Sequence, residues 1–536
     1  MDHIRYIKDL HCDELPSFFK RATGSYYTSE SVGKALVTRL LAGKIALLER
    51  IKVVDPFAGD GRLIKWLLQT WQSMGLPNIE WDIELWDCDN NALAKAQESL
   101  SEFAVKLSVR NSDSFKIGLK RMSDYDLVLT NPPWEILKPD RRELKYFESE
   151  VKINYVQKLK MYDRWLGENY PISQPNAKFA GWGTNLSRVG LELALKLTRK
   201  GGYVGIVLPS SFLADQQSVQ IRKMMFRDYK VDHIFYYPAE SKQYTGADVT
   251  SISMLLRSES VKKNELDLAI DTYREKRYDE VRFKTSVHKL ASSDYVVPVS
   301  FGSKAIKSTE RISANFPKWL DLEHAGILWA GRELDETKKD EWLDDSIDSE
   351  HFFVKGRMIE RYRICNHPTH KVSKKDWNAP ASTKYNRIVW RDVSRPNQKR
   401  RITAAIIPEK WVAGNSLNVA HVFGYNQVLL KNLLAVMNSF AFEFQLRSFL
   451  STSHISLGAV RKVGVPNFDQ LKSDSNIAEL VENYILGDNL FEYDIDARVA
   501  KYFYDFNIQE YSSIIQEFPK ISVKEKSKYL EAFDTI

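Results

Sequence analysis

The sequence predicts an α/β fold in the first half of the chain, with a twisted, mostly parallel sheet and helices on both of its faces. Apolar runs that end near residues 54, 86 and 130 have the length of buried strands. The segments between them include helical spacing, as in Leu63-Ile64-Trp66-Leu67-Leu68. Strands that alternate with helices form parallel sheets, which bind ligands at the carboxyl ends of their strands. We therefore expect functional residues at these ends.

The first strand end carries a glycine turn. Val53-Val54 is followed by Asp55-Pro56-Phe57-Ala58-Gly59-Asp60-Gly61, and the helical pattern begins directly afterwards. Gly59 and Gly61 allow a tight turn and a close approach of the backbone to a ligand. Such turns occur in nucleotide-binding crossovers, although the spacing here differs from the dinucleotide fingerprint GxGxxG.

Carboxylates follow the next two strand candidates. Asp87 ends the run Ile83-Glu84-Leu85-Trp86, where it could accept both hydroxyls of a ribose, and Cys88 after it would form a small apolar wall. Asp113 lies within Ser112-Asp113-Ser114-Phe115, where it could bind an adenine amino group. Helix capping is the alternative role of an aspartate after a strand. The order of these acids along the chain favours a nucleoside ligand.

The strand Asp126-Leu127-Val128-Leu129-Thr130 ends on Asn131-Pro132-Pro133-Trp134. Asn131 and Pro132 offer carbonyl oxygens, and the two prolines hold the turn rigid. Two acceptors on one amino group would direct the lone pair of a conjugated nitrogen toward an incoming methyl group, and Trp134 could stack on the ring. The tetrapeptide indicates methylation of a planar nitrogen; the alternative is an ordinary turn.

With these motifs in this order, the chain resembles the gamma class of S-adenosylmethionine-dependent N6-adenine DNA methyltransferases, found in bacterial restriction-modification and phage-defence systems. The segment Gly24-Ser25-Tyr26-Tyr27-Thr28-Ser29 precedes the glycine turn, as in that class, and the resemblance covers about residues 20 to 257. It implies a Rossmann-like methyltransferase domain with a seven-stranded, mostly parallel sheet. It also implies a C-terminal target-recognition domain of mixed α/β structure.

The resemblance assigns residues to the cofactor, S-adenosyl-L-methionine. Tyr27 and Thr28 would hold its methionine end, and the turn from Asp55 to Gly61 its amino acid and ribose. Asp87 would bind the ribose hydroxyls and Asp113 the adenine. The full set of cofactor-binding residues is Tyr27, Thr28, Asp55, Pro56, Phe57, Ala58, Gly59, Gly61, Asp87, Cys88, Asp113, Ser114 and Asn131.

The resemblance also implies the catalytic residues. Asn131, Pro132, Pro133 and Trp134 match the catalytic tetrapeptide of the class, and Tyr244 matches an aromatic residue that covers the other face of the flipped base. A target adenine is therefore expected between Trp134 and Tyr244. The expected reaction is in-line attack of its amino nitrogen on the cofactor's methyl group, without a covalent enzyme intermediate and without a metal ion.

The chain has 536 residues and a formal net charge of +7, unevenly distributed. Residues 351 to 401 contain 14 Lys and Arg but 3 Asp and Glu, whereas residues 331 to 350 contain 9 acids and 3 bases. A basic stretch interleaved with aromatic residues suits phosphate binding, although most such stretches are solvated surface. The candidate DNA-binding residues are Arg387, Arg391, Arg395, Lys399, Arg400, Arg401, Arg447 and His454.

Three domains or segments are expected along the chain. The catalytic domain would span residues 1–270, a polar connection 271–320, and the target-recognition domain, with a helical C-terminal part, 321–536. Residues 135–183 form a long basic and aromatic insertion that we expect over the DNA site. Alternatively, an apolar helix stripe packs this insertion on its own domain; that stripe is Val151, Tyr155, Leu159, Tyr162 and Trp165.

Cysteine spacing and hydropathy indicate the cellular compartment in which the protein is expected. Cys12, Cys88 and Cys365 lack the spacing of a zinc site or a disulfide framework. The sequence shows no apolar run of membrane-spanning length and no signal segment at its N-terminus. A cytoplasmic, monomeric protein without a membrane partner is expected.

The expected function is site-specific methylation of adenine N6 in duplex DNA, as the modification component of a restriction-modification or phage-defence system. An RNA N6-adenine methyltransferase could carry the same tetrapeptide, and a catalytically idle DNA-binding subunit of a defence complex is the non-enzymatic alternative. A protein glutamine methyltransferase is disfavoured because that family usually has Tyr at the position of Trp134. No nuclease signature is apparent, so a separate endonuclease or other defence proteins are expected as partners.

Overall fold

The computed structural model divides the chain into two compact units, Met1–Ser300 (unit 1) and Phe301–Ile536 (unit 2). It describes residues 28–43, 45, 49–139, 144, 148–175, 178, 182–244, 249–259, 265–274, 277–299, 302–336, 343–344, 350–372, 378–396, 398–450, 453–487 and 491–536. Among these residues, no helix is both long enough and apolar enough to cross a bilayer.

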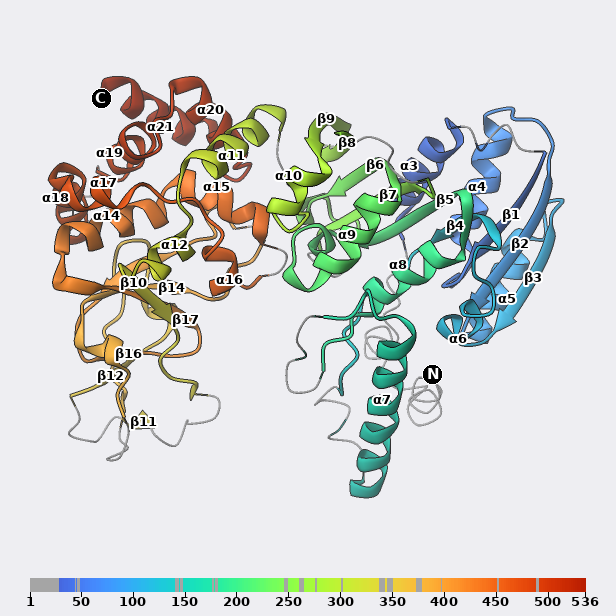
Figure 1. Ribbon diagram of the computed structural model, residues 1–536, viewed down its shortest axis with the longest axis horizontal. Coiled ribbons are helices and arrows are strands. Elements are labelled where there is room, and N and C mark those ends of the chain that lie inside the picture. The colour runs from blue at the N-terminus through green and yellow to red at the C-terminus, as the bar shows by residue number, and fades with distance from the viewer. Residues whose placement is uncertain are drawn as a thin grey trace. The chain divides into compact units, whose positions relative to one another are not determined.

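Unit 1 is built on a mixed, mostly parallel sheet (Figure 1). Its strands are β1 (Arg50–Asp55), β2 (Glu80–Asp87), β3 (Lys106–Asn111), β4 (Tyr125–Thr130), β5 (Thr198–Pro209), β6 (Lys230–Tyr237), β7 (Ser251–Arg257), β8 (Glu265–Arg274) and β9 (Arg277–Ser286). The order is β3-β2-β1-β4-β5-β7-β6-β8-β9. The first five strands of this order, β3, β2, β1, β4 and β5, run parallel to one another. Strand β7 is antiparallel to both β5 and β6.

The described residues form nine strands in this sheet, which corrects the expectation of seven. The two additional strands, β8 and β9, form an antiparallel hairpin, and β8 pairs in parallel with β6. Leu266, Leu268 and Ile270 of β8 are buried, as are Val281 and Phe283 of β9, while charged residues occupy the other face. The sequence suggested a polar connection from residue 271 because alternate positions of these strands are exposed and charged.

Helices cover both faces of the sheet of unit 1 (Figure 1). The described helices of unit 1 are α3 (Glu30–Leu41), α4 (Arg62–Ser73), α5 (Asn90–Leu100), α6 (Ser114–Gly118), α7 (Ser149–Asn169), α8 (Leu186–Leu197), α9 (Val219–Asp228) and α10 (Val287–Ser292), and all of them except α7 lie near the sheet (Figure 1). On one face α3 packs on α4 and α4 on α5, around a core that contains Leu36, Leu67, Val53 and Leu127. Elsewhere α8 contacts β4, β5 and α6. The carboxyl ends of the parallel strands form the edge of the sheet at which ligands are expected.

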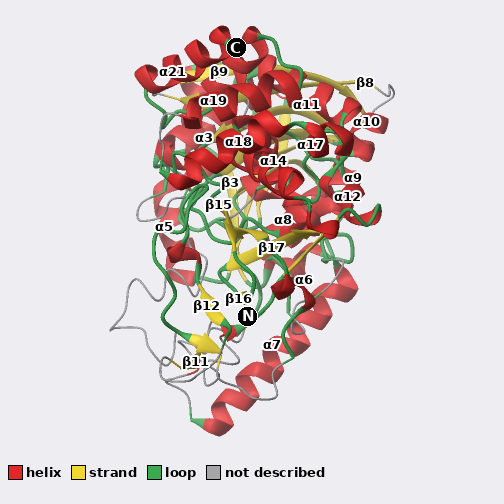
Figure 2. Ribbon diagram, turned by 90° about the vertical axis from the view of Figure 1, so that its left-hand side faces the viewer, coloured by secondary structure: helices red, strands yellow, loops and turns green. Residues whose placement is uncertain are grey.

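Helix α7 lies in the predicted insertion and projects away from the sheet (Figures 1 and 2). Its buried residues are Tyr155, Leu159, Asp163 and Leu166, and Asp163 forms an ion pair with Lys178 of the same insertion. This burial matches the predicted apolar stripe at Tyr155 and Leu159. The opposite side of α7 is solvent-exposed, with Ile153 60% and Met161 71% exposed.

Unit 2 contains two small sheets and a group of helices. The sheets have the orders β10-β17-β14-β15 and β11-β13-β12-β16 in the described part of the chain. The strands are β10 (Leu328–Gly331), β11 (Leu343–Asp344), β12 (Phe352–Val354), β13 (Lys371–Val372), β14 (Arg387–Arg391), β15 (Ala404–Ile407), β16 (Trp411–Ala413) and β17 (Leu417–Val422). Val389 and Val419 lie in a core of buried residues that joins both sheets.

Most helices of unit 2 follow these sheets in the sequence. The helices are α11 (Ser303–Asn315), α12 (Trp319–His324), α14 (Gln427–Asn438), α15 (Phe440–Phe449), α16 (Leu457–Val460), α17 (Phe468–Ser473), α18 (Ser475–Leu486), α19 (Phe491–Arg498), α20 (Ile508–Gln516) and α21 (Val523–Thr535). Helix α14 contacts strands β14, β15 and β17, so it connects the helical part to the first sheet.

Candidate active site

The predicted cofactor residues gather at the carboxyl ends of neighbouring strands in unit 1. Strand β1 pairs with β2 on one side and with β4 on the other, in parallel. Asp55 ends β1, Asp87 ends β2 and Asn131 follows β4. Strands that run parallel place their ends at the same edge of the sheet, so residues separated by more than 70 positions come together.

Asp55 is the most deeply buried carboxylate of this group, with 1% of its surface exposed. Its Oδ1 accepts a hydrogen bond from Thr130 Oγ1 at 2.6 Å and another from the backbone N–H of Phe57 at 3.1 Å. Burial raises the pKa of Asp55 to about 7, against the lowering effect of these two hydrogen bonds. A cationic ligand would stabilise the ionised form of this buried carboxylate, because an opposite charge would compensate its desolvation.

Asp87 holds the glycine turn in place. Its Oδ2 accepts the backbone N–H of Gly59 at 2.8 Å, and its Oδ1 accepts the N–H of Asp89 at 2.8 Å. Gly59 and Gly61 have φ angles of 53° and 75°, which favour glycine. A Cβ on Gly61 would lie 2.9 Å from the Cβ of Ala96, so helix α5 closes against this turn. The turn is therefore specified both by backbone conformation and by close packing.

Asp113 and Ser114 connect the end of β3 to the same turn. Ser114 donates a hydrogen bond to the carbonyl of Pro56, and the rings of Phe57 and Phe115 lie 5.2 Å apart. Asp113 caps α6 through Phe115 N–H at 3.0 Å, so the capping role considered from the sequence is present. Oδ1 of Asp113 accepts this capping hydrogen bond. Oδ2 of the same carboxylate is buried without a hydrogen-bond partner among the described residues.

The tetrapeptide after β4 contacts both a predicted cofactor residue and helix α8. Asn131 Nδ2 donates to Thr28 Oγ1 at 3.1 Å, and Thr28 is 3% exposed. A Cβ on Gly190 of α8 would lie 2.3 Å from Pro132 Cβ, so only glycine at position 190 lets Pro132 pack there. Sequence reasoning overlooked Gly190; the signal was a glycine inside a helical leucine pattern, which often marks close packing.

Trp134 and Tyr244 also come together, with ring centroids 5.1 Å apart and ring planes at 62°. This edge-on contact leaves no slot for a base between the two rings, since a base stacked between parallel rings needs about twice the usual stacking distance. The segment before Tyr244 is tied to α3 and its N-cap, because Gln243 Oε1 accepts hydrogen bonds from Ser29 and Ser31. A planar ring could therefore lie between them only if one of the two rings moved.

The other predicted cofactor residues differ in their exposure to solvent, and some lie outside the described residues. Pro56 and Ala58 are buried in the turn, whereas Cys88 is exposed. Tyr27 and residues 24–26 lie outside the described residues. No cluster of three or more His, Cys, Asp or Glu that could hold a metal ion occurs within the described ranges.

Several predicted DNA-binding residues of unit 2 are structural instead. Arg387 and Glu333 form an ion pair in which both side chains are 0% exposed, and Arg387 also donates to the carbonyl of Pro408 at 3.1 Å. An arginine that is fully enclosed in this way is unavailable to a phosphate.

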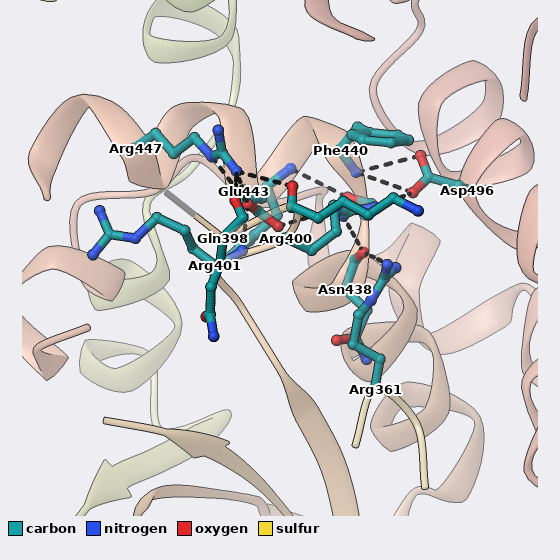
Figure 3. A network of polar contacts seen from close by, with 12 residues as sticks. Arg361, Gln398, Arg400, Arg401, Asn438, Phe440, Glu443, Arg447 and Asp496 are labelled. Atoms are coloured by element: carbon teal, nitrogen blue, oxygen red, sulfur yellow. Dashed lines mark hydrogen bonds and ion pairs between the residues drawn. The ribbon is translucent and has the colours of Figure 1, made fainter. Parts of the chain in front are cut away.

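The same correction applies to a buried network around Glu443 (Figure 3). Glu443 accepts hydrogen bonds from Arg400 Nε at 2.8 Å, from Arg401 N–H at 2.7 Å and from Arg447 at 2.7 Å. Although burial acts to raise it, Arg447 and Arg400 hold the pKa of Glu443 down to about 2. Arg400 is 6% and Arg447 15% exposed in their side chains, so both charges are used inside unit 2.

The remaining candidates are partly accessible. Arg391 Nε donates to the carbonyl of Gly356 at 2.8 Å, and its other nitrogen donates to that of Ile359. His454 contacts Asp392 at 2.8 Å with 60% of its side chain exposed. Arg395 is exposed, and Lys399 is 49% exposed while paired with Glu525 at 2.5 Å. Of these four, Arg391 is half-buried, whereas Arg395, Lys399 and His454 are exposed on the surface of unit 2.

Residues 67–244 match the family model of the Eco57I restriction-modification methylase. The matched range begins inside α4 and ends at Tyr244, so it includes Asp87, Asp113 and the tetrapeptide. The Type II methyltransferase M.BanIII of Aneurinibacillus aneurinilyticus is 24% identical over 255 residues, which cover 44% of this chain and 38% of M.BanIII. The chain thus matches about two fifths of the length of that relative.

Two solved structures can be superposed on larger parts of the chain. A nuclease-deletion mutant of the Type ISP restriction-modification enzyme LlaGI, in complex with a DNA substrate mimic, has a TM-score of 0.50 at 10% identity and covers 91% of this chain and 48% of its own. The Type IIL restriction-modification enzyme MmeI in complex with DNA has a TM-score of 0.49 at 12% identity, over 100% of this chain and 75% of its own.

Proposed function

We propose that this chain is an S-adenosylmethionine-dependent DNA methyltransferase that modifies N6 of adenine, as the modification component of a restriction-modification or phage-defence system. The observation that carries the proposal is Asn131-Pro132-Pro133-Trp134 at the carboxyl end of β4, together with carboxylates at the ends of β1 and β2 and after β3, of which Asp55 and Asp113 are buried. Methyl transfer to a conjugated amino group needs both a cofactor site and paired acceptors, and this edge offers both.

The residues present fit the cofactor by their chemistry. The buried carboxylate of Asp55 suits an ammonium group, and Asp113 Oδ2 is a buried acceptor that a ligand N–H can satisfy. The Gly59 backbone lets a ligand approach closely, and Asp87 has lone pairs left for the two hydroxyls of a ribose. When bound, S-adenosylmethionine would supply an electrophilic methyl group.

The chain's own residues would then act on the target base. The side-chain carbonyl of Asn131 and the backbone carbonyl of Pro132 accept the two hydrogens of the adenine amino group, which turns its lone pair away from the ring. Trp134 offers one stacking face and Tyr244 the other, after one of these rings has moved. The hydrogen bond between Asn131 Nδ2 and Thr28 fixes which end of the amide faces the base.

Duplex DNA is the proposed substrate, and a separate endonuclease or other defence proteins are the proposed partners. On unit 2, Arg395, Lys399 and His454 are the accessible members of the basic set and are our candidates for phosphate contacts. Phosphate contacts of this kind orient a protein on DNA and carry little sequence information. We assign catalysis to unit 1 and target recognition to unit 2, with 135–183 as an insertion near the DNA, as our proposal for the division of labour.

A transfer assay with nucleoside analysis tests the reaction. The purified chain is incubated with S-adenosylmethionine labelled in its methyl group and with unmethylated duplex DNA or RNA, and the nucleosides are then separated. We expect label in N6-methyldeoxyadenosine, none with Asn131→Ala, and normal transfer with Asn78→Ala, which removes an exposed asparagine at the amino end of β2. Label in RNA alone would show that RNA, and not DNA, is the substrate. Full activity of Asn131→Ala would refute the site.

A further inference from the structure

The C-terminal half of α7 reaches the predicted adenine end of the cofactor site. Tyr162 of α7 donates a hydrogen bond from its hydroxyl to Asp113 Oδ1 at 3.2 Å. The ring of Trp165 stacks on that of Tyr162, with centroids 5.9 Å apart and planes at 9°. Trp165 in turn meets Tyr170 edge-on, and the Tyr170 hydroxyl donates to the carbonyl of Phe115 at 2.5 Å. Aromatic contacts therefore fix this half of α7 onto the turn that contains Asp113.

The two carboxylate oxygens of Asp113 have unequal partners. Oδ1 accepts two hydrogen bonds, from Phe115 N–H at 3.0 Å and from Tyr162. Oδ2 is buried and has no hydrogen-bond partner among the described residues, and Asp113 as a whole is 7% exposed. A buried acceptor without a donor is costly, so this oxygen is prepared for a donor that a ligand brings.

Tyr162 stays a donor under all ordinary conditions. Burial and the negative charge of Asp113 raise the pKa of its hydroxyl well above the usual value for tyrosine. The hydroxyl therefore keeps its single proton, which it donates to Oδ1 of Asp113. With both donors on Oδ1, the orientation of the carboxylate is set and Oδ2 is the oxygen left over.

We propose that Tyr162 is a positioning residue for cofactor selectivity: its hydroxyl orients Asp113 so that Oδ2 accepts the 6-amino group of adenine. The insertion that contains α7 then has a role in recognising the cofactor's base, in addition to any role near DNA. This inference rests on the proposed function, because it takes an adenine-containing cofactor as the ligand. Tyr162 acts through Asp113 and does not itself bind the amino group.

A packing role is the rival explanation for the same contacts. Tyr162 stacks on Trp165, and the ammonium of Lys116 lies 6.0 Å from the centre of each ring. If only this packing mattered, phenylalanine at position 162 would serve equally well for every ligand. The two explanations therefore differ in whether the hydroxyl changes the preference for a 6-amino group.

A binding cycle separates them without any need for turnover. The full chain and its Tyr162→Phe variant are titrated calorimetrically with S-adenosylhomocysteine and with its analogue in which the purine lacks the 6-amino group. In the wild type, removing the amino group should weaken binding about tenfold or more, as for a hydrogen bond to a charged acceptor. In Tyr162→Phe the same removal should cost about threefold or less, because Asp113 is no longer held. Tyr155→Phe makes the same chemical change seven residues earlier on α7 and should retain the wild-type ratio.

Three outcomes for the variant would overturn the inference. If Tyr162→Phe weakens both ligands equally, the hydroxyl supports the site without selecting the 6-amino group. If the variant binds both ligands more tightly, Tyr162 competes with the base instead of positioning its acceptor. A variant with wild-type affinity for both would show that the hydroxyl has no part in binding. Failure of the wild type to bind either ligand would refute the proposed function, and the inference with it.

Discussion

Replacing Asp55 by asparagine should separate the stability of unit 1 from its capacity to bind a cofactor. Burial raises the pKa of Asp55 from 3.8 to about 7. Between pH 3.8 and about pH 7, the folded state therefore holds a proton on Asp55 that the unfolded state has lost. The ionised carboxylate therefore destabilises the fold above pH 7, by at most about 4 kcal/mol. This cost decreases as the pH falls from 7 toward 4.

Asparagine retains the Oδ1 that accepts hydrogen bonds from Thr130 and Phe57, but its amide N–H₂ would be buried without an acceptor. That unpaired amide costs about 1–3 kcal/mol, so Asp55→Asn should raise the free energy of unfolding by about 1–3 kcal/mol at pH 8. Between pH 8 and pH 5 the difference between variant and wild type should decrease by about 3 kcal/mol, because only the wild type titrates.

The measurement is urea unfolding of the full chain at pH 5, 6, 7 and 8, followed by tryptophan fluorescence. Asp60→Asn is the matched control, because it removes a carboxylate with 24% of its side chain exposed from the same turn. S-adenosylhomocysteine binding should move in the opposite direction, since the ammonium needs ionised Asp55: wild-type affinity should fall below pH 7 and the variant should bind poorly throughout. Parallel stability profiles for wild type and Asp55→Asn would refute the reasoning, because no buried titration would then exist.

Three further variants test other parts of the structure. Gly61→Ala should destabilise unit 1 by about 1–2 kcal/mol in thermal melting, because φ is 75° and the new Cβ would lie 2.9 Å from that of Ala96; unchanged melting would contradict this turn. Arg387→Met should cost unit 2 about 3–5 kcal/mol, since it leaves the Glu333 carboxylate buried without its partner, and a neutral effect would show that this pair is dispensable. The double variant Arg395→Ala and Lys399→Ala should reduce the salt dependence of DNA binding by a slope of up to about 2, and an unchanged slope would remove both from the interface.

The sequence predicted the positions of the candidate site residues at the strand ends because each short motif and its strand lie in one continuous segment. Asp55, Asp87 and Asn131 each directly end or follow an apolar run, and parallel pairing then brings the three runs together. The mutual contacts of the site were beyond such reasoning. The bond from Tyr162 to Asp113 spans 49 positions, and nothing in the helical pattern of α7 distinguishes Tyr162 from its neighbours.

Charge patterns were a weaker guide than motifs. A run of arginines looks the same whether the side chains are exposed or paired, and the partners of Arg387 and Arg400 lie 54 and 43 positions away. Both partners are glutamates that the composition of the basic stretch does not include. The hairpin of β8 and β9 was missed for a related reason, because the charged residues on one face of each strand hid the apolar residues on the other.

The most direct test of adenine methylation is to express the chain in a host that lacks adenine methylation and to sequence the host's native DNA by a single-molecule method that reports N6-methyladenine by position. The Asn131→Ala variant, expressed to the same level, is the control. We expect one recurring sequence motif with a modified adenine in the wild type and none in the variant. Unmodified DNA from cells that contain folded wild-type protein able to bind S-adenosylhomocysteine would contradict DNA adenine methylation by this chain acting alone.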